Sequence, residues 1–169
     1  MRIIGIDPGY AIIGFGVLEY RGGLDFAVVD FGAITTPADI PFNDRLKMIY
    51  DDMTQVLETY KPDQMGIEKL YFNTNETTAI SVAQARGVTL LPAIQRGIKI
   101  CEYTPLQVKL SITGYGRAEK KQVQEMTRQI LHLSKIPKPD DVADALGIAI
   151  CHGHTAFSLS GILSESGAN

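Results

Sequence analysis

Apolar residues follow a strand-like pattern in the first third of the chain and a helical spacing after it. In the first third they predominate in three short segments, which Pro8-Gly9 and Gly22-Gly23 separate as turns. The segments predict strands at Arg2 to Ile6, Ile12 to Tyr20 and Leu24 to Thr35. Two hairpins in succession would join these strands into an antiparallel meander.

Helical spacing begins after the meander. Apolar residues between Asn43 and Tyr60 recur at helical intervals and Pro62 then ends the pattern, so a helix is predicted there. Further strands are predicted at Gln64 to Glu68 and Ile98 to Tyr103, and further helices at Glu76 to Gln95, Pro105 to Ile112, Glu119 to Leu133 and Pro139 to about Phe157. This order predicts an α/β fold with a five-stranded mixed sheet, in which three antiparallel strands precede two parallel ones and helices cover both faces.

Length and composition are those of one globular domain. The chain has 169 residues, of which 45% are hydrophobic and 21% charged. We expect a single domain over residues 1–158 and a flexible C-terminal tail over residues 159–169. No apolar run reaches the roughly 18 residues that a membrane span requires. Asp7 and Pro8 interrupt the apolar N-terminus where a signal peptide would continue, so we expect a cytoplasmic protein.

Basic residues are concentrated in one part of a chain whose net charge is −3. Between Arg96 and Lys138 there are nine basic and three acidic residues, a local charge of +6, whereas Pro139 to Asn169 holds four acidic residues and no Lys or Arg. A metal-dependent nuclease needs such a separation, because carboxylates bind the ion and a basic surface binds phosphates. A solvated helix face is the simpler explanation of the run, so charge alone does not decide between them.

Two predicted strands end on a carboxylate. Asp7 follows the apolar run of the first strand, and Glu68 follows Met65-Gly66-Ile67. An unpaired carboxylate buried there would cost several kcal/mol, so a compensating charge is expected. If the two strands are neighbours in the sheet, both carboxylates lie at the same edge.

A further group of carboxylates opens the last predicted helix. Asp141 and Asp144 are three positions apart and therefore project from one side of its first turn. Asp140 fits the role of an N-cap. Capping and the helix dipole, each contributing about 0.3–1 kcal/mol, explain Asp140 and Asp141 but not an aspartate at position 144 of an apolar segment.

Carboxylates that meet at one place repel one another and require cations. Ligand sets made only of oxygen suit hard ions, so Mg²⁺ is expected, with Mn²⁺ as a substitute. Two such ions about 3.5–4 Å apart are suited to in-line hydrolysis of a phosphodiester, because one activates water and the other stabilises the leaving oxygen.

Several short motifs occur together in the order and spacing of a known family. They are Ile4-Gly5-Ile6-Asp7-Pro8-Gly9, Gly14-Phe15-Gly16-Val17, Ile67-Glu68, Gln84-Ala85-Arg86-Gly87, Gln107-Val108-Lys109, Ala118-Glu119-Lys120 and Asp141-Val142-Ala143-Asp144-Ala145-Leu146. Together they resemble the bacterial RuvC Holliday-junction resolvases, over a stretch from Arg2 to about His154. The resemblance implies an RNase H-like fold, a homodimer, a branch-migration motor complex as partner, and paired symmetric nicks across a four-way DNA junction in recombination and repair.

The resemblance also assigns roles to residues. The catalytic, metal-binding tetrad falls on Asp7, Glu68, Asp141 and Asp144, and so on Asp141 rather than Asp140. The two important lysines of the family fall on Lys109 and Lys120, which we expect to contact phosphates at or near the scissile bond. Arg117 and Lys121 are further expected DNA contacts.

Two neighbouring aromatic residues follow Glu68. Tyr71 stands where relatives of the family commonly carry Phe, and Phe72 comes directly after it. Either ring would stack on unpaired bases at the junction centre or pack into the core.

Small residues mark one side of the helix predicted after Asn75. Ala79, Ala83 and Gly87 are four positions apart and form a ridge. The ridge allows either close approach of the same helix in a second copy or packing against the sheet of its own chain.

Cysteine and histidine residues give no metal-binding spacing. Cys101 and Cys151 are expected to be buried free thiols. His152 and His154 point to different faces of a helix, which favours histidines near a helix end over a metal cluster.

Two other functions remain open. The glycines around Asp7 also resemble the phosphate hairpin of ATP-binding modules in sugar kinases and heat-shock ATPases, although those enzymes bind nucleotide between two domains. The other alternative is a protein that binds junctions without cutting them.

Overall fold

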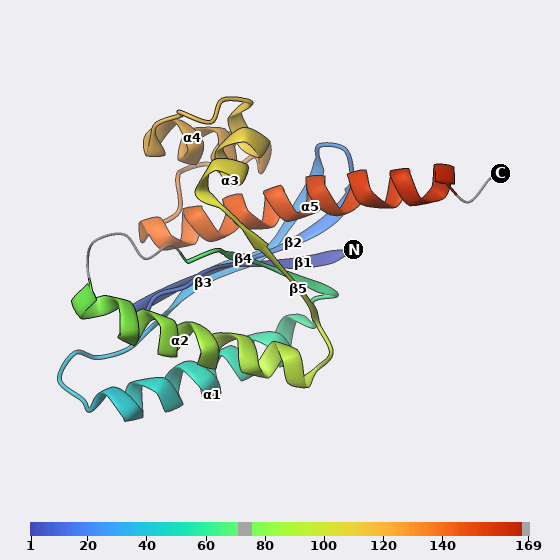
Figure 1. Cartoon of the computed structure of the whole chain (residues 1–169). Coiled ribbons are helices and arrows are strands. Elements are labelled where there is room, and N and C mark those ends of the chain that lie inside the picture. The colour runs from blue at the N-terminus through green and yellow to red at the C-terminus, as the bar shows by residue number, and fades with distance from the viewer. Residues whose placement is uncertain (71–75, 167–169) are drawn as a thin grey trace.

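A five-stranded mixed sheet lies between two layers of helices (Figure 1). The computed structural model describes residues 1–70 and 76–166. The strand order is β3-β2-β1-β4-β5, in which β1, β2 and β3 are antiparallel and β4 and β5 run parallel to β1. The strands are β1 (Arg2–Asp7), β2 (Ile12–Gly22), β3 (Asp25–Thr35), β4 (Gln64–Glu68) and β5 (Lys99–Tyr103). The predicted fold class is confirmed.

Five helices in the described part of the chain cover the two faces of this sheet. They are α1 (Phe42–Tyr60), α2 (Glu76–Gln95), α3 (Pro105–Thr113), α4 (Lys120–Ile130) and α5 (Asp140–Ser166). Helices α1 and α2 lie on one face, and α5 crosses the other face with α3 and α4 beyond it (Figure 1). No described helix has the length and hydropathy needed to cross a membrane.

Alternation along β1 separates two cores. Ile4 and Ile6 belong to the core that packs under α1, where Ile49, Met53 and Leu57 recur one helical turn apart. Ile3 belongs to the second core, with residues of α5 such as Leu146 and Ile150. Asp7 has the same parity as Ile3 and therefore faces α5.

Glycines let α5 lie directly on the strands. A Cβ atom at Gly5 of β1 would lie 2.1 Å from the carbonyl oxygen of Ala145. A Cβ atom at Gly14 of β2 would lie 2.0 Å from the carbonyl oxygen of Asp141. Since any side chain at these positions would collide with helix backbone, the glycines fix where α5 begins over the strand ends.

Two predicted helix ends were wrong. Helix α4 ends at Ile130 rather than Leu133. His132 has a positive φ of 52°, and a right-handed helix cannot continue through a residue in this left-handed conformation. Helix α5 continues to Ser166 rather than ending at about Phe157. Once a helix is established, each added residue gains a hydrogen bond at little cost, so the Ser and Gly residues after Phe157 do not stop it. The flexible tail over residues 159–169 stays a prediction.

Candidate active site

Asp7 and Glu68 lie side by side at the carboxyl ends of two parallel strands. The register pairs Ile6 of β1 with Ile67 of β4, so the next residue of each strand is a carboxylate. Both side chains are partly buried, and a hydrogen bond links them. The parallel pairing makes β1 and β4 neighbours in the sheet and so brings both carboxylates to the same edge.

The start of α5 brings Asp141 and Asp144 to the same edge. Because the carbonyl of Asp141 sits against Gly14, which pairs with Asp7 across β1 and β2, the first turn of α5 lies over Asp7. Burial, followed by repulsion from Glu68, Asp144 and Asp141, raises the pKa of Asp7 to about 8. The other three carboxylates therefore all lie within electrostatic reach of Asp7.

Glu68 responds to the same surroundings. Burial and the charge of Asp144 raise the pKa of Glu68, although the hydrogen bond with Asp7 and the charge of Lys120 oppose the shift. Two neighbouring carboxyls with raised pKa values indicate a site with too much negative charge for its degree of burial. A bound cation would remove this penalty.

Lys120 is the cation that the protein itself supplies. Its Nζ lies 2.8 Å from Oδ2 of Asp144 and 3.7 Å from Oδ2 of Asp140. The hydrogen bond with Asp144 is the main reason that the pKa of Lys120 is raised. Lys120 is the first residue of α4, so the start of that helix is tied to the start of α5.

Asp140 differs from the other aspartates at this helix start. Its Oδ1 lies 2.5 Å from Nζ of Lys138, and this contact is the main reason that the pKa of Asp140 is lowered. The expected N-cap role was wrong, because Asp140 is already the first residue of α5 and its carboxylate pairs with lysines. A charge neutralised in this way is less available to a metal ion than that of Asp141.

The carboxylates form no finished metal site. Across the described residues, no group of three or more His, Cys, Asp or Glu side chains is arranged to hold a metal ion. The ammonium of Lys120 instead contacts Asp144. A cation binding here would therefore take over at least part of the position that Lys120 holds.

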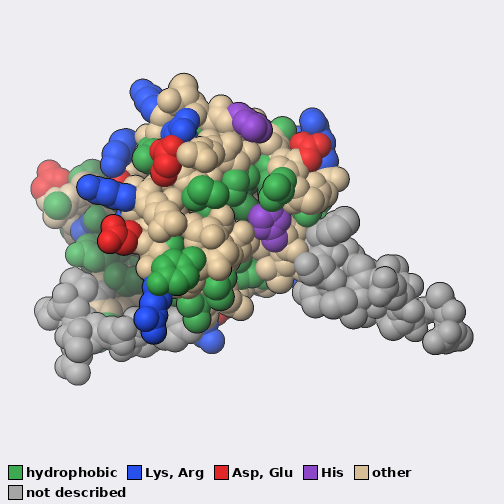
Figure 2. Space-filling view, turned by 90° about the horizontal axis from the view of Figure 1, so that it is seen from above, with side chains coloured by type: hydrophobic (Ala, Val, Ile, Leu, Met, Phe, Trp, Pro, Cys, Tyr) green, Lys and Arg blue, Asp and Glu red, His purple; other side chains and the backbone are tan. Residues whose placement is uncertain are grey.

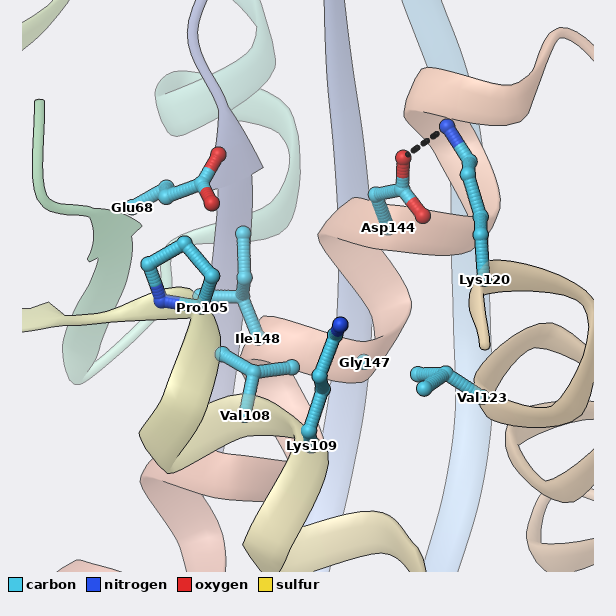
Figure 3. Close-up of a pocket in the computed structure, with 9 residues that line it drawn as sticks. All are labelled: Glu68, Pro105, Val108, Lys109, Lys120, Val123, Asp144, Gly147 and Ile148. Carbon is cyan, nitrogen blue, oxygen red and sulfur yellow. Dashed lines mark ion pairs between the residues drawn. The ribbon is translucent and has the colours of Figure 1, made fainter. Parts of the chain in front are cut away.

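A cavity of about 280 Å³ opens beside the carboxylates, between α3, α4 and α5 (Figure 3). Its charged lining consists of Glu68, Asp144, Lys109 and Lys120. Its other lining residues are Pro105, Val108, Val123, Gly147 and Ile148. Lys109 extends from α3 toward the space between Glu68 and Asp144 (Figure 3). Both predicted lysines thus lie beside the carboxylates.

The basic run of the sequence is divided between the two layers. Arg96 lies after α2 and pairs with Glu58 of α1 at 2.6 Å, so it belongs to the opposite layer from Lys120. The basic residues between Arg96 and Lys138 therefore do not all lie on one surface. On the face formed by α3, α4 and α5, lysine and arginine side chains gather on the side where α5 begins (Figure 2). Arg117 and Lys121 are exposed just before and within α4.

Comparison with known proteins identifies the family. The model of the family described as crossover junction endodeoxyribonuclease RuvC matches residues 3–152. The chain belongs to the RuvC family. RuvC of Brevibacillus brevis is 58% identical over 152 residues, which are 90% of this chain and 91% of that protein. RuvC of Halothermothrix orenii is 55% identical over 92% of this chain and 93% of its own length.

A solved RuvC structure has the same fold. RuvC of T. thermophilus, in complex with a Holliday junction substrate, superposes with a TM-score of 0.85 at 31% identity and covers 92% of this chain and 95% of its own. The RNase H-like architecture expected from the resemblance is therefore confirmed. Membership of the RuvC family favours a nuclease over the ATP-binding module and over a protein that binds junctions without cutting them.

Several predicted features lie elsewhere or outside the described residues. Tyr71 and Phe72 lie outside the described residues, so their contacts with DNA or core stay predictions. His152 is buried inside α5 rather than near its end, and its ring nitrogens lie 2.8 Å from Oη of Tyr103 and 2.8 Å from Oε1 of Gln64. Cys151 is a buried free thiol as predicted, whereas Cys101 is only half-buried.

Sequence reasoning missed two parts of the site. One is the contact of Gly5 and Gly14 with α5; small residues facing one side of two adjacent strands were the available signal. The other is the apolar wall of the cavity, made by Val108 and Val123 on separate helices. No spacing along the chain indicates that α3 and α4 meet in this way.

Proposed function

We propose that this chain resolves four-way DNA junctions by paired, symmetric, Mg²⁺-dependent hydrolysis of phosphodiester bonds. The observation that carries the proposal is the gathering of Asp7, Glu68, Asp141 and Asp144 beside Lys109 and Lys120. The name of the family and the junction complex of its T. thermophilus member support the same substrate.

The donor set of the site fits a hard divalent cation. All four side chains offer oxygen, and burial together with the neighbouring carboxylates raises the pKa values of Asp7 and Glu68. We expect Asp7, Glu68, Asp141 and Asp144 to hold two Mg²⁺ ions, with Mn²⁺ as a substitute. When bound, two such ions supply an activated water and stabilise the developing charge on the leaving oxygen.

The lysines then act on the DNA strand. Lys109 reaches into the space between Glu68 and Asp144, where its ammonium would bind an oxygen of the scissile phosphate (Figure 3). Lys120 would leave Asp144 when a cation binds and contact the same or the adjacent phosphate. Arg117 and Lys121 are exposed in the same layer and would hold the flanking backbone.

The proposed active form is a homodimer. A four-way junction has approximate two-fold symmetry, so an isologous dimer presents two equivalent active sites. On α2, Ile80 (69% exposed), Leu91 and Ile94 are exposed apolar residues on the same side as Gly87, and a Cβ at Gly87 would meet nothing within 4 Å. Of the predicted small-residue ridge, Ala79 and Ala83 are half-buried and Gly87 is exposed, so the exposed stripe includes only the Gly87 end of the ridge.

A charge in the apolar stripe tests the dimer. We expect Leu91→Glu to convert the protein to monomers, measured as mass by light scattering during gel filtration, and to uncouple the two nicks on one junction. Leu24→Glu, at an exposed hairpin residue, is the matched control. A Leu91→Glu protein that keeps the mass of the wild type would refute this interface.

Incubation with DNA tests the proposed activity. A synthetic immobile four-way junction and a linear duplex of matched sequence are compared with and without Mg²⁺. We expect two nicks in the junction, little cutting of the duplex, and no product without the ion. Binding of the junction without nicking in either Mg²⁺ or Mn²⁺ would support a non-catalytic protein instead, and stabilisation by ATP beyond that by Mg²⁺ alone would support a nucleotide-binding module.

Two wider expectations accompany this function. A branch-migration motor complex is the expected partner, since it would deliver the junction to the dimer. The cytoplasm is the expected location. Both stay predictions.

A further inference from the structure

The cavity beside the carboxylates has two chemically different sides. Glu68, Asp144 and Lys120 lie along one side, whereas Pro105, Val108 and Val123 form the opposite one (Figure 3). Lys109 stands between the two sides. The charged side explains how metal ions and a phosphate would bind, but it gives the exposed surface of the apolar side no part in binding the substrate.

A phosphate does not suit the apolar side. Val108 and Val123 are half-buried residues that pack against the core under α5 on one side and line the accessible cavity on the other. Placing a charged group against them without partners would cost several kcal/mol. A flat, mostly apolar group with a polar edge would instead gain from desolvation on that side while its edge stays near the lysines.

A DNA strand that places its phosphate at the lysines brings such a group with it. Each nucleotide next to the scissile phosphate carries a base whose faces are apolar and whose edge forms hydrogen bonds. Extruding a base from a duplex costs a few kcal/mol, and the cost is lowest where the base is already unpaired or unstacked. The crossover point of a four-way junction is such a place.

We infer that the apolar side of this cavity receives one base of the cleaved strand, next to the scissile phosphate, and thereby contributes to the choice of cleavage sequence. The inference rests on the proposed junction-cutting function. It gives Val108 and Val123 the role of contacting the substrate base, while the lysines and carboxylates act on the phosphate between the bases.

Val123→Phe tests the inference, because the larger ring would fill the space intended for the base. Cleavage is measured on an intact junction and on two junctions that each lack one base, on either side of the cut. We expect kcat/KM on the intact junction to fall by at least about tenfold, the effect of a changed fit in an apolar pocket. On the junction that lacks the bound base, we expect the wild type and the variant to cut at nearly equal rates.

Controls separate failure of this inference from failure of the proposed function. Val29→Phe makes the same change at an exposed residue of β3 and should cut all three junctions like the wild type. Calorimetry with Mn²⁺ and thermal unfolding verify that the metal site and the fold of Val123→Phe are intact. A wild type that cuts no junction would refute the function itself. If the wild type cuts the junctions, two results would refute the base pocket. One is an equal loss of kcat/KM in Val123→Phe on all three junctions, and the other is no loss on any of them.

A second variant covers the case in which Val123→Phe fails to fold. Val123→Ala enlarges the cavity, so it should discriminate less between junctions that differ only in the base next to the cut. We expect the ratio of kcat/KM between the best and the worst of the four bases to fall toward one. An unchanged spread would overturn the inference.

Discussion

The two faces of the sheet are packed in different ways. Under α1, large side chains such as Ile4, Ile6 and Met53 interlock between strand and helix. Under the first turns of α5, Gly5 and Gly14 bring strand and helix backbones together without intervening side chains. Side chains adjust to small changes by altering their rotamers, whereas backbone atoms in contact have no such freedom. The carboxylates lie on the face with the more rigid contact, where their positions are fixed most closely.

The difference also separates two tasks. The α5 face holds the carboxylates and lysines of the candidate active site and the cavity beside them. The α1 and α2 face holds an apolar core and has an exposed apolar stripe on α2. A change in the carboxylates should therefore alter chemistry without altering association, and a change in the α2 stripe should do the reverse.

The largest expected effect is that of Asp7→Asn. The substitution keeps the size of the side chain and removes a charge from the group that would hold the metals, so we expect cleavage to fall by at least about a thousandfold, as for one member of a cooperating catalytic group. Junction binding, measured by fluorescence anisotropy, should persist because the lysines are untouched. Nicking at the wild-type rate would exclude Asp7 from the site.

Gly14→Ala tests whether the backbone contact is as rigid as proposed. Its new Cβ would lie 2.0 Å from the carbonyl oxygen of Asp141, so we expect a loss of about 3 kcal/mol or more in the free energy of unfolding. Gly66→Ala is the control, since the nearest atom to its Cβ is a side-chain atom of His152 at 3.1 Å. The control should lose about 1 kcal/mol in denaturant titrations. Equal losses in the two variants would contradict the special role of the α5 start.

His152 gives the α5 face a dependence on pH. Burial, assisted by Lys99, lowers the pKa of His152 to about 4 from its ordinary 6.5. The contribution of neutral His152 to the stability of the fold is complete above pH 6.5 and is lost as the pH falls toward 4. In that range the imidazole takes up a proton only in the unfolded chain. Over this pH range, we expect the free energy of unfolding of the wild type to fall by up to about 3 kcal/mol more than that of His152→Gln. Parallel profiles of unfolding free energy against pH would contradict the assignment.

The smallest expected effect is that of Lys120→Gln on metal binding. Its ammonium contacts Asp144 at 2.8 Å and competes with a cation there. Because an exposed ion pair contributes about 0.2–1 kcal/mol, removing it should tighten Mn²⁺ binding by roughly 1.4- to fivefold in calorimetry, while cleavage becomes slower. Weaker Mn²⁺ binding would show that Lys120 supports the metal site rather than occupying it. Lys121→Gln, on the neighbouring exposed residue, should leave the affinity unchanged.

Local pattern was sufficient for most elements. The strand Gln64–Glu68 and the helix Glu76–Gln95 have the predicted bounds, because their limits coincide with changes in apolar spacing. The predicted C-terminal ends of α4 and α5 were wrong, because a helix end without a strong stop signal depends on backbone hydrogen bonds and tertiary packing. The sequence also could not show that Arg96 lies in a different layer from Lys120, because neighbours in sequence separate where the chain crosses from one layer to the other.

The sequence by itself determined which residues carry charge, which strands end on a carboxylate, and which side of β1 Asp7 shares with Gly5. These properties depend on residue type and on the two-residue period of a strand. The tertiary structure alone decided that Asp7 and Glu68 are neighbours, that Lys120 contacts Asp144, and that Val108 and Val123 face one cavity. Strand order and helix contact join residues far apart in the chain, and no local spacing encodes the distance between them.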